Sequence, residues 1–243
     1  MMPAPPADGP GNVLRAMSIG NLLHPLATRH PHDGPVFPDP RDAVQYQRTR
    51  EMTLDELMLE NRVVFLIGEI TQVSAARVMM QMLYLEDQQR GQEINLYINS
   101  PGGSVDDTLA VYDTMQFLSS EIATFCIGRA YSGGAVLLCA GTPGKRHILP
   151  HAKVMIHQPY GGVTGQTTDV LIQAEQIIKA KQMLNEILAQ HCGQTVERVA
   201  ADGERDRYFD AQEAKDYGLV DEVFTPSEKG SNGEKKSKKK KDS

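Results

Sequence analysis

The stretch EINLYINSPGGSVDDTLAVYDTMQFL, residues 93–118, contains the unit from which the predicted fold is built. Its first part, EINLYIN, predicts a strand over 93–99 that ends at turn-forming residues. Pro101 and two glycines then form a turn, and apolar residues at helical spacing predict a helix from about residue 105 to residue 118. A strand followed directly by a helix is the repeating unit of α/β proteins.

The same alternation continues on both sides of this unit. The apolar run RVVFLIG (62–68) predicts a buried strand, and Ser74 is expected to cap a helix that runs to about Gln89. The remaining predicted elements are helices at 54–61, 133–140 and 166–191, strands at 121–127 and 153–156, and two short helices, one capped by Thr195 and one by Asp210 with Glu213. Gly193 and Gly218 stand where helices usually stop. The pattern indicates the α/β class.

Both ends of the chain differ in composition from this block. Residues 1–45 are rich in proline and lack apolar periodicity, and residues 226–243 are rich in lysine. We therefore expect a disordered segment at 1–45, one folded domain at 46–225 and a disordered Lys-rich tail at 226–243. From residue 229 onward seven lysines face two acidic residues, so the net charge of −6 divides into +5 on the tail and −11 on the rest. A solvated tail is the favoured interpretation over contact with nucleic acid or an anionic surface.

Composition also argues against several classes of protein. Cys126, Cys139 and Cys192 are far apart and odd in number, so we interpret them as reduced thiols in or near the core. None of the seven histidines stands at metal-ligand spacing to them. No apolar run approaches the ~20 residues of a membrane span, and no charged N-terminal region precedes an apolar core, so no secretory signal is expected.

One segment has a partial similarity to a phosphate-binding loop. GTPGKRH (141–147) has the Gly-Lys pair, but Cys139 occupies the place of the first glycine and Arg146 that of the magnesium-binding Ser or Thr. The chain also contains no G-x-G-x-x-G dinucleotide fingerprint. We therefore expect that this chain carries no cofactor and does not hydrolyse ATP itself.

The segment GRAYSGGAVLLCAG (128–141) places Ser132 after a predicted strand and before a predicted helix. Small neighbours leave room for the sharp turn that exposes a nucleophilic serine, and the helix dipole and the Gly133 N–H would favour an oxyanion there. The turn NSPGGS (99–104) offers further bare N–H groups at a helix start. From the pattern alone, both segments could equally be tight turns without chemistry.

A serine hydroxyl needs a base to become nucleophilic. The histidines available in the folded block are His147, His151, His157 and His191. We favour His157, because it follows the strand KVMI and the carboxyl ends of strands in α/β sheets face the site, although it could also be a turn residue. For His191, a cationic cap at a helix end is the simpler interpretation. Spacing does not select the orienting acid among Asp202, Asp206, Asp210, Asp216 and Asp221.

Taken together, these residues resemble one known family. The segments NSPGGS, VYDTMQF, GRAYSGGAVLL, VMIHQPYGG, GQTTD and ERDRYF follow one another in the order and spacing of the Clp protease proteolytic subunit. The resemblance covers roughly residues 54–223, about the whole predicted domain.

The resemblance implies a site and an activity. Ser132 would be the nucleophile, His157 the general base, and Asp206 the group that fixes the imidazole tautomer. Backbone N–H groups of Gly103 and Gly133 would form the oxyanion hole. The chain is thereby expected to be a serine endopeptidase subunit of an ATP-dependent protease, which hydrolyses unfolded polypeptides to short peptides inside a barrel chamber.

The resemblance also implies an architecture and partners. The fold would be a crotonase-like spiral of repeated β-β-α units with a protruding handle helix at 166–191. Two stacked heptameric rings of this chain would enclose the chamber, and an AAA+ unfoldase, which uses the ATP, would deliver unfolded proteins. Nucleic acid and membrane are not expected as partners. A bacterial-type cytoplasm is the expected location, in preference to an organelle matrix or stroma.

Two departures from the family pattern flank the serine, and two other functions stay open. The family usually has Ala and Met at the positions of Tyr131 and Gly133. We expect Tyr131 to narrow the substrate pocket and Gly133 to loosen the oxyanion geometry. These flanks leave open a weakly active or non-catalytic ring subunit of a hetero-oligomer. A hydratase-like acyl-CoA enzyme on the same fold is the other alternative, and it would need acidic catalysts and a CoA pocket.

Overall fold

A computed structural model of the chain describes residues 52–159 and 164–224. The compact unit that begins at Leu54 carries the sheet and the candidate site. The predicted disordered segments at 1–45 and 226–243 lie outside the described residues, so both remain predictions. No helix in the described ranges is both long and apolar enough to cross a membrane.

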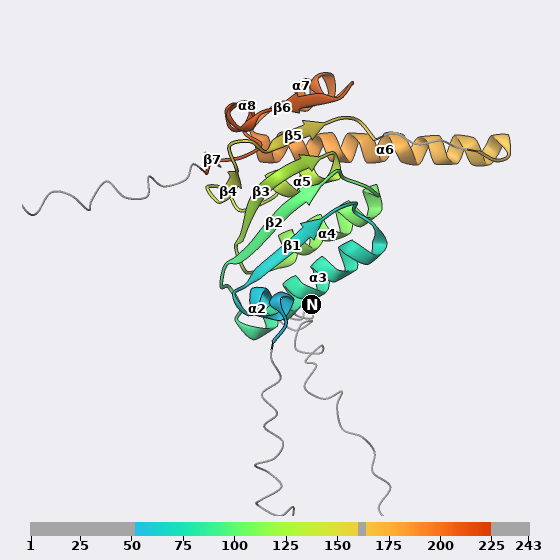
Figure 1. Ribbon diagram of the computed structural model, residues 1–243. Coiled ribbons are helices and arrows are strands. Elements are labelled where there is room, and N and C mark those ends of the chain that lie inside the picture. Colours follow the sequence, from blue (N-terminus) through green and yellow to red (C-terminus); the bar gives the residue numbers. More distant parts are fainter. Residues whose placement is uncertain (1–51, 160–163, 225–243) are drawn as a thin grey trace, which may run out of the picture. The chain divides into compact units, whose positions relative to one another are not determined.

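A mostly parallel sheet organises this unit (Figure 1). Its parallel path runs in the order β1-β2-β3-β4-β7, with β1 at Val63–Ile67, β2 at Ile94–Ser100, β3 at Ile122–Tyr131, β4 at Arg146–Ile148 and β7 at Glu222–Val223. The far end of the long strand β3 pairs in parallel with β5 (Lys153–Ile156), and β5 pairs antiparallel with β6 (Arg207–Phe209). The sheet therefore changes partner along β3, and the candidate site forms where it does.

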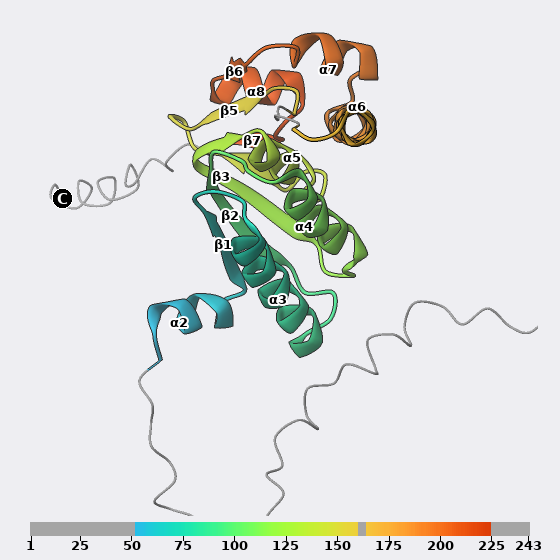
Figure 2. The same cartoon turned by 90° about the vertical axis from the view of Figure 1, so that its right-hand side faces the viewer.

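Helices connect the strands, as the sequence predicts. They are α2 (Leu54–Glu60), α3 (Gln72–Gln88), α4 (Val105–Phe117), α5 (Gly133–Cys139), α6 (Thr167–Cys192), α7 (Val196–Asp202) and α8 (Ala211–Tyr217). Figure 2 shows α3 and α4 side by side along one face of the sheet. In Figure 1 the 26-residue helix α6 runs past the sheet and extends beyond it.

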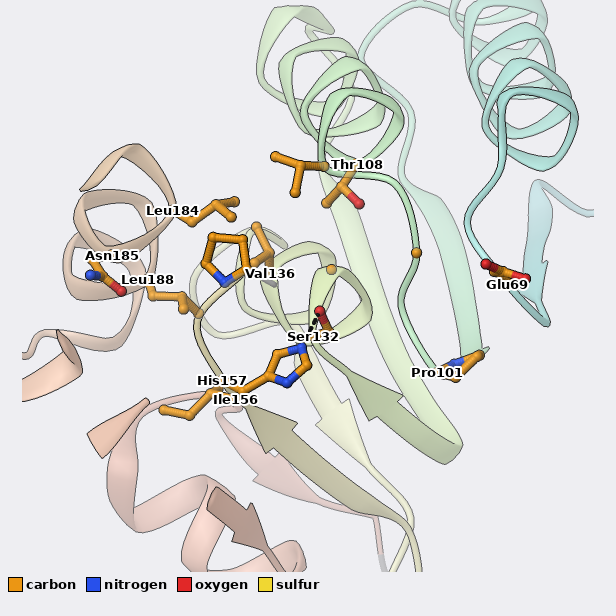
Figure 3. A pocket seen from close by; sticks show the side chains of 14 residues that line it. Glu69, Pro101, Thr108, Ser132, Val136, Ile156, His157, Leu184, Asn185 and Leu188 are labelled. Atoms are coloured by element: carbon orange, nitrogen blue, oxygen red, sulfur yellow. Dashed lines mark hydrogen bonds between the residues drawn. The ribbon is translucent and has the colours of Figure 1, made fainter. Parts of the chain in front are cut away.

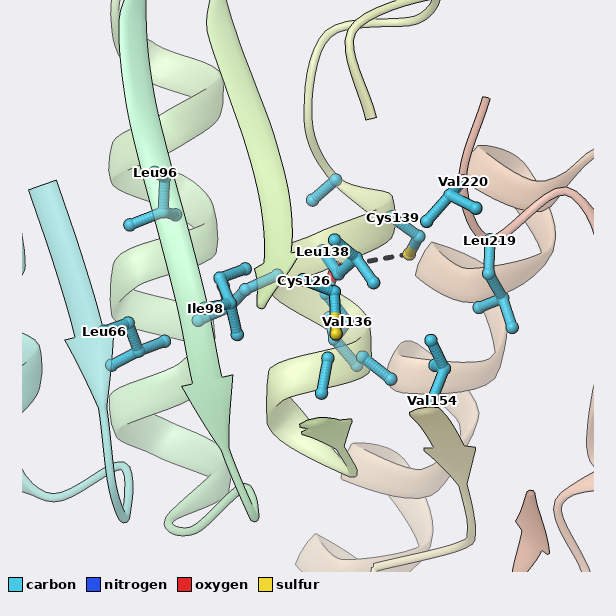
Figure 4. Close-up of a cluster of buried hydrophobic side chains, with 14 of the residues drawn as sticks. Leu66, Leu96, Ile98, Cys126, Val136, Leu138, Cys139, Val154, Leu219 and Val220 are labelled. Atoms are coloured by element: carbon cyan, nitrogen blue, oxygen red, sulfur yellow. Dashed lines mark hydrogen bonds between the residues drawn. The ribbon is translucent and has the colours of Figure 1, made fainter. Parts of the chain in front are cut away.

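The core lies between this sheet face and the helices. Alternate residues of β2, among them Leu96 and Ile98, are fully buried, because successive side chains of a strand point to opposite faces. Figure 4 shows them in one cluster with Leu66 of β1 and Leu138 of α5. Burial of such side chains stabilises the fold by about 1.5–3 kcal/mol each.

The other sheet face carries a row of aromatic side chains. Phe65, Tyr97 and Phe125 stand in register on β1, β2 and β3, with ring centroids 5.5 and 4.7 Å apart. Phe65 is 41% exposed and Ile67 is 53% exposed. The prediction of a fully buried strand at 62–68 is thus wrong for one face, because β1 is an edge strand that helices cover from one side only.

Most of the predicted helix ends are confirmed, and the differences have local causes. Gly193 and Gly218 adopt the left-handed conformation as helix C-caps, and Asp210 forms the predicted capping box. The cap of α3 is Thr71 rather than Ser74, which instead serves as the third residue of that capping box. The short strands β4, β6 and β7 were not predicted. All three cysteines are unpaired and buried.

Arg146 of β4 ties the ends of three helices together. Its Nη1 donates to the carbonyls of Cys139, His191 and Gly218, which belong to the C-terminal ends of α5, α6 and α8. Its Nε and Nη2 bind both carboxylate oxygens of Asp221 at 2.9 and 2.5 Å. Burial alone would raise the pKa of Asp221, but the hydrogen bonds from Arg146 lower it. The positive charge thereby also neutralises three helix-dipole ends.

Candidate active site

Ser132 lies at the turn between β3 and α5, with φ 55° and ψ −121°. A positive φ is uncommon for a residue with a side chain. The turn is held by two hydrogen bonds: the Ser132 N–H donates to Met155 O at 2.8 Å, and the Ser132 carbonyl accepts the Ala135 N–H at 2.9 Å. A strained strand–turn–helix that exposes a serine is the geometry of a nucleophile elbow.

The turn of NSPGGS packs directly against this serine. A Cβ atom at Gly102 would lie 2.6 Å from the Cβ of Ser132, and Gly102 itself has φ +90°. Both the contact and the backbone conformation therefore require glycine at this position. The two turns that the sequence singled out are thus neighbours in space.

His157 follows the last residue of β5 and reaches Ser132. Its Nε2 lies 2.9 Å from Ser132 Oγ, and Figure 3 shows the two side chains facing each other. The parallel pairing of β3 with β5, with Tyr131 opposite Met155, brings the ends of both strands together. The His157 side chain is 13% exposed, so it is largely shielded from solvent.

Asp206 contacts the other ring nitrogen of the same histidine. Its Oδ1 lies 3.1 Å from His157 Nδ1, and its side chain is 56% exposed. The antiparallel pair of Ile156 with Arg207 sets the preceding residue, Asp206, beside the following residue, His157. An Nδ1–H that donates to the carboxylate leaves Nε2 as the acceptor for the serine hydroxyl.

The other histidines considered from the sequence lie elsewhere. His147 stacks on Phe125 at 4.7 Å, and His151 is exposed in the turn between β4 and β5. His191 is half-buried, with its Nε2 3.1 Å from the Tyr112 hydroxyl, and burial together with the nearby Arg146 lowers its pKa. The lowered pKa argues against the predicted role of His191 as a cationic helix cap, and Arg146 is the cation that binds a carbonyl at this end of α6.

The remaining aspartates each have a structural partner. Asp202 pairs with Arg207 and accepts a hydrogen bond from Tyr217, and Asp210 caps α8. Asp216 accepts from Gln212, and Asp221 binds Arg146. Asp206 is the one of the five candidates that the structure brings to His157.

Two backbone N–H groups flank the serine. The parallel bridge between Ile70 and Gly103 uses the Gly102 carbonyl and the Ser104 N–H, so the Gly103 N–H is not part of it. Gly133 is the first residue of α5, and N–H groups in a first helical turn have no acceptor within the helix. Both glycines line the cavity at Ser132, where their N–H groups could receive negative charge.

A cavity of about 240 Å³ opens beside Ser132 (Figure 3). Its wall is mixed, and the apolar part comes from Val105, Val136, Ile156, Pro159, Leu184 and Leu188. Glu69 and Asn185 are the polar side chains that join Ser132, His157 and Thr108 in the lining. The apolar part of this wall can contact an apolar side chain of a bound molecule.

The two departures beside the serine have different consequences. Tyr131 is not among the residues that line the cavity; its ring meets the Tyr208 ring edge-on at 5.5 Å. The expectation that Tyr131 narrows the pocket is therefore wrong for the cavity beside Ser132. Gly133 does line the cavity, next to Thr108.

Two of the three cysteine thiols are unsuited to act as a nucleophile in place of Ser132. Burial raises the pKa of Cys126 to about 12. A hydrogen bond with Cys192, together with burial, raises the pKa of Cys139. A thiol needs its thiolate form to react, so neither group is nucleophilic at neutral pH. Within the described ranges, no group of three or more His, Cys, Asp or Glu side chains is placed to hold a metal ion.

Sequence reasoning missed the side chains that shape the cavity. Thr108, Leu184, Asn185 and Leu188 come from α4 and α6, far from the serine in the chain. Leu184 and Leu188 are spaced as neighbours on one helix face, which is a signal for a shared surface but not for its location.

Comparison with known proteins agrees with this geometry. A family model described as Clp protease matches residues 46–227. A protein of Rhodopirellula baltica named ATP-dependent Clp protease proteolytic subunit 1 is 55% identical over 179 residues, covering 74% of this chain and 79% of the relative. The matched range contains Ser132, His157, Asp206 and the cavity.

Proposed function

This chain belongs to the Clp protease family, and on that basis we propose that it is the serine peptidase subunit of an ATP-dependent protease that cleaves unfolded polypeptides. The observation that carries the proposal is the chain of contacts from Ser132 through His157 to Asp206 beside a cavity with a partly apolar wall. In this proposal the three side chains are a Ser-His-Asp triad.

The first half of the reaction forms an acyl-enzyme. Ser132 Oγ attacks the carbonyl carbon of the peptide bond while its proton moves to His157 Nε2. The carbonyl π electrons move to oxygen, and this oxyanion accepts hydrogen bonds from the N–H groups of Gly103 and Gly133. The imidazolium then gives its proton to the leaving amine as the C–N bond breaks.

The second half uses water. His157 takes a proton from a water molecule, whose oxygen attacks the acyl carbon, and the imidazolium returns that proton to Ser132 Oγ as the ester bond breaks. Asp206 accepts the Nδ1–H hydrogen bond throughout, which keeps Nε2 facing the serine. Because Asp206 is 56% exposed, its main contribution is to orient the ring rather than to supply a strong buried charge.

The finer architecture is part of the same proposal. We propose a crotonase-like spiral in which α6 is the handle that meshes two heptameric rings. The length of α6 and its exposed Leu171, Ile172 and Ile178 support this role, because a solvated apolar helix face is suited to a partner. The partner that spends ATP would be an AAA+ unfoldase, and this chain would hold no cofactor. A bacterial-type cytoplasmic location also stays a proposal.

The alternatives have less support. A non-catalytic ring subunit does not need Ser132, His157 and Asp206 at hydrogen-bonding distances. The acyl-CoA hydratase hypothesis would leave that same arrangement without a use. Membership in the Clp protease family also favours the peptidase.

Peptide hydrolysis by the assembled full chain tests the proposed function. We expect Ser132→Ala to lower kcat by roughly 10⁴–10⁶, while native mass spectrometry shows an unchanged assembly. Ser119→Ala, in the loop after α4 and outside the cavity, is the matched control and should keep full activity. Peptide cleavage that survives Ser132→Ala would contradict the proposal, and absence of a ring from the chain alone would favour the hetero-oligomer.

A further inference from the structure

Gly133 follows the proposed nucleophile, and a neighbouring helix rather than its own backbone conformation excludes a side chain at this position. Its φ is not in the left-handed region, so the main chain would accept a side chain there. What excludes one is contact with α4. A Cβ atom at Gly133 would lie 2.4 Å from Thr108 Oγ1 and 3.1 Å from Thr108 Cγ2, distances that require something to move.

Thr108 cannot easily move. It is 1% exposed, and its Oγ1 donates to the Ser104 carbonyl at 2.7 Å, one turn earlier in α4. A β-branched side chain in a helix has few alternative rotamers, and turning Oγ1 away would leave this buried hydroxyl without its acceptor. The threonine therefore holds the space that a side chain at position 133 would otherwise fill.

That space belongs to the cavity beside Ser132. Thr108 and Gly133 both line it, from α4 and α5, together with Val105, Val136 and Leu184. Figure 3 labels Thr108, Val136 and Leu184 around it. The hydroxyl proton of Thr108 is used by Ser104, so the threonine contributes bulk to the wall rather than a free donor. An apolar substrate side chain that enters the cavity is thus limited on this side by Thr108 and not by residue 133.

We propose that Thr108 and Gly133 form a coupled pair that sets the size of the pocket, and hence the size of the substrate side chain accepted next to the cleaved bond. The inference rests on the proposed peptidase function and deepens it by naming a specificity-determining residue, Thr108, that neither the sequence pattern nor the triad indicates. Each member of the pair is acceptable only because of the other.

Peptides that differ only in the residue before a fluorogenic leaving group test the claim that Thr108 limits the size of the pocket. We expect Thr108→Ala, which keeps the helix but removes Oγ1 and Cγ2, to shift the kcat/KM ratio of a Phe peptide to an Ala peptide by about tenfold toward Phe. Thr114→Ala is the matched control. It removes the same i−4 hydrogen bond from the same helix, where Thr114 Oγ1 donates to Ala110 O at 2.8 Å, but Thr114 does not line the cavity.

A double substitution tests the coupling. Gly133→Ala alone should lower kcat/KM for the Ala peptide by roughly 100-fold, and Thr108→Ala in the same chain should restore at least about tenfold of that loss, since contacting residues are not additive. Native mass spectrometry of each variant controls for assembly. If Gly133→Ala does not assemble, the ratio measured with Thr108→Ala alone still decides the size claim.

The outcomes separate this inference from the function on which it rests. If cleavage survives Ser132→Ala, the proposed function fails and the size claim falls with it. If cleavage depends on Ser132 but Thr108→Ala leaves the Phe-to-Ala ratio as in the wild type, only the size claim is overturned. An equal shift with Thr114→Ala would also overturn it, because the effect would then come from α4 as a whole.

Discussion

His157 Nε2 lies 2.9 Å from Ser132 Oγ because two strands that are separated in sequence end at the same point of the sheet. Tyr131 pairs with Met155 across β3 and β5, so Ser132, the first residue after β3, lies near His157, the first residue after β5. The pairing of β3 with β5 and of β5 with β6 therefore positions all three side chains of the proposed triad.

Asp206→Asn tests the orienting role of the carboxylate. An amide can place an N–H toward His157 Nδ1, which favours the tautomer with the proton on Nε2 and removes the acceptor for the serine hydroxyl. We expect kcat to fall by about 10²–10⁴ with little change in KM. Asp216→Asn, an exposed aspartate bonded to Gln212, is the control and should be neutral. Steady-state kinetics with one peptide decide between these results, and a neutral Asp206→Asn would exclude the role.

Gly102→Ala tests the contact between the two turns. A Cβ at Gly102 meets the Cβ of Ser132 at 2.6 Å, so the serine turn must shift and we expect kcat/KM to fall by at least about 100-fold. Gly91→Ala is a matched control, because Gly91 has a similar positive φ but open space around it. That variant should lose only about 1 kcal/mol of stability and keep its activity. Equal activities in the two variants would contradict the predicted contact.

Arg146→Met tests the link between three helix ends. The substitution leaves Asp221 without its charged partner and removes the Arg146 donor from three carbonyls, so we expect the free energy of unfolding to fall by about 3 kcal/mol. Lys145→Met, at the neighbouring position, removes exposed ion pairs with Glu93 and Glu121 and should change stability far less. Urea unfolding curves of both variants measure the loss of unfolding free energy. A similar loss in the two variants would contradict the prediction.

The lowered pKa of His191 predicts that the stability of the fold depends on pH. Burial and the nearby Arg146 lower its pKa in the folded state, so below the ordinary histidine pKa of about 6.5 the unfolded chain binds the proton more readily. Stability from this group is therefore present above that pH and is lost as pH falls through the lowered folded pKa. His191→Gln should reduce the loss of stability between about pH 7 and 5, measured by thermal unfolding.

The sequence could predict the elements with strong periodicity and clear caps. The strand and helix around NSPGGS, the serine turn, and the ends at Gly193 and Gly218 are all where the pattern places them. These features depend on local chemistry: turn glycines, capping side chains and apolar spacing. Ser132 could be singled out for the same reason, because a nucleophile elbow is a local motif.

Features that depend on pairing between distant segments could not be predicted. The strands β4, β6 and β7 have two or three residues each, too few for any period. Asp206 could not be separated from the other aspartates by spacing, since its place beside His157 comes from the antiparallel pairing of β5 with β6. The exposed face of β1 and the cavity wall at Thr108 likewise depend on how helices pack against the sheet and against one another. No single segment of sequence determines that packing.

Covalent labelling of the assembled full chain with a fluorophosphonate probe tests the central claim most directly. If His157 activates Ser132, mass spectrometry of the labelled protein should locate one adduct on Ser132, and His157→Ala should slow its formation by at least about 100-fold without loss of assembly. An assembled wild-type sample with no adduct on Ser132, or one labelled equally fast after His157→Ala, would contradict the account.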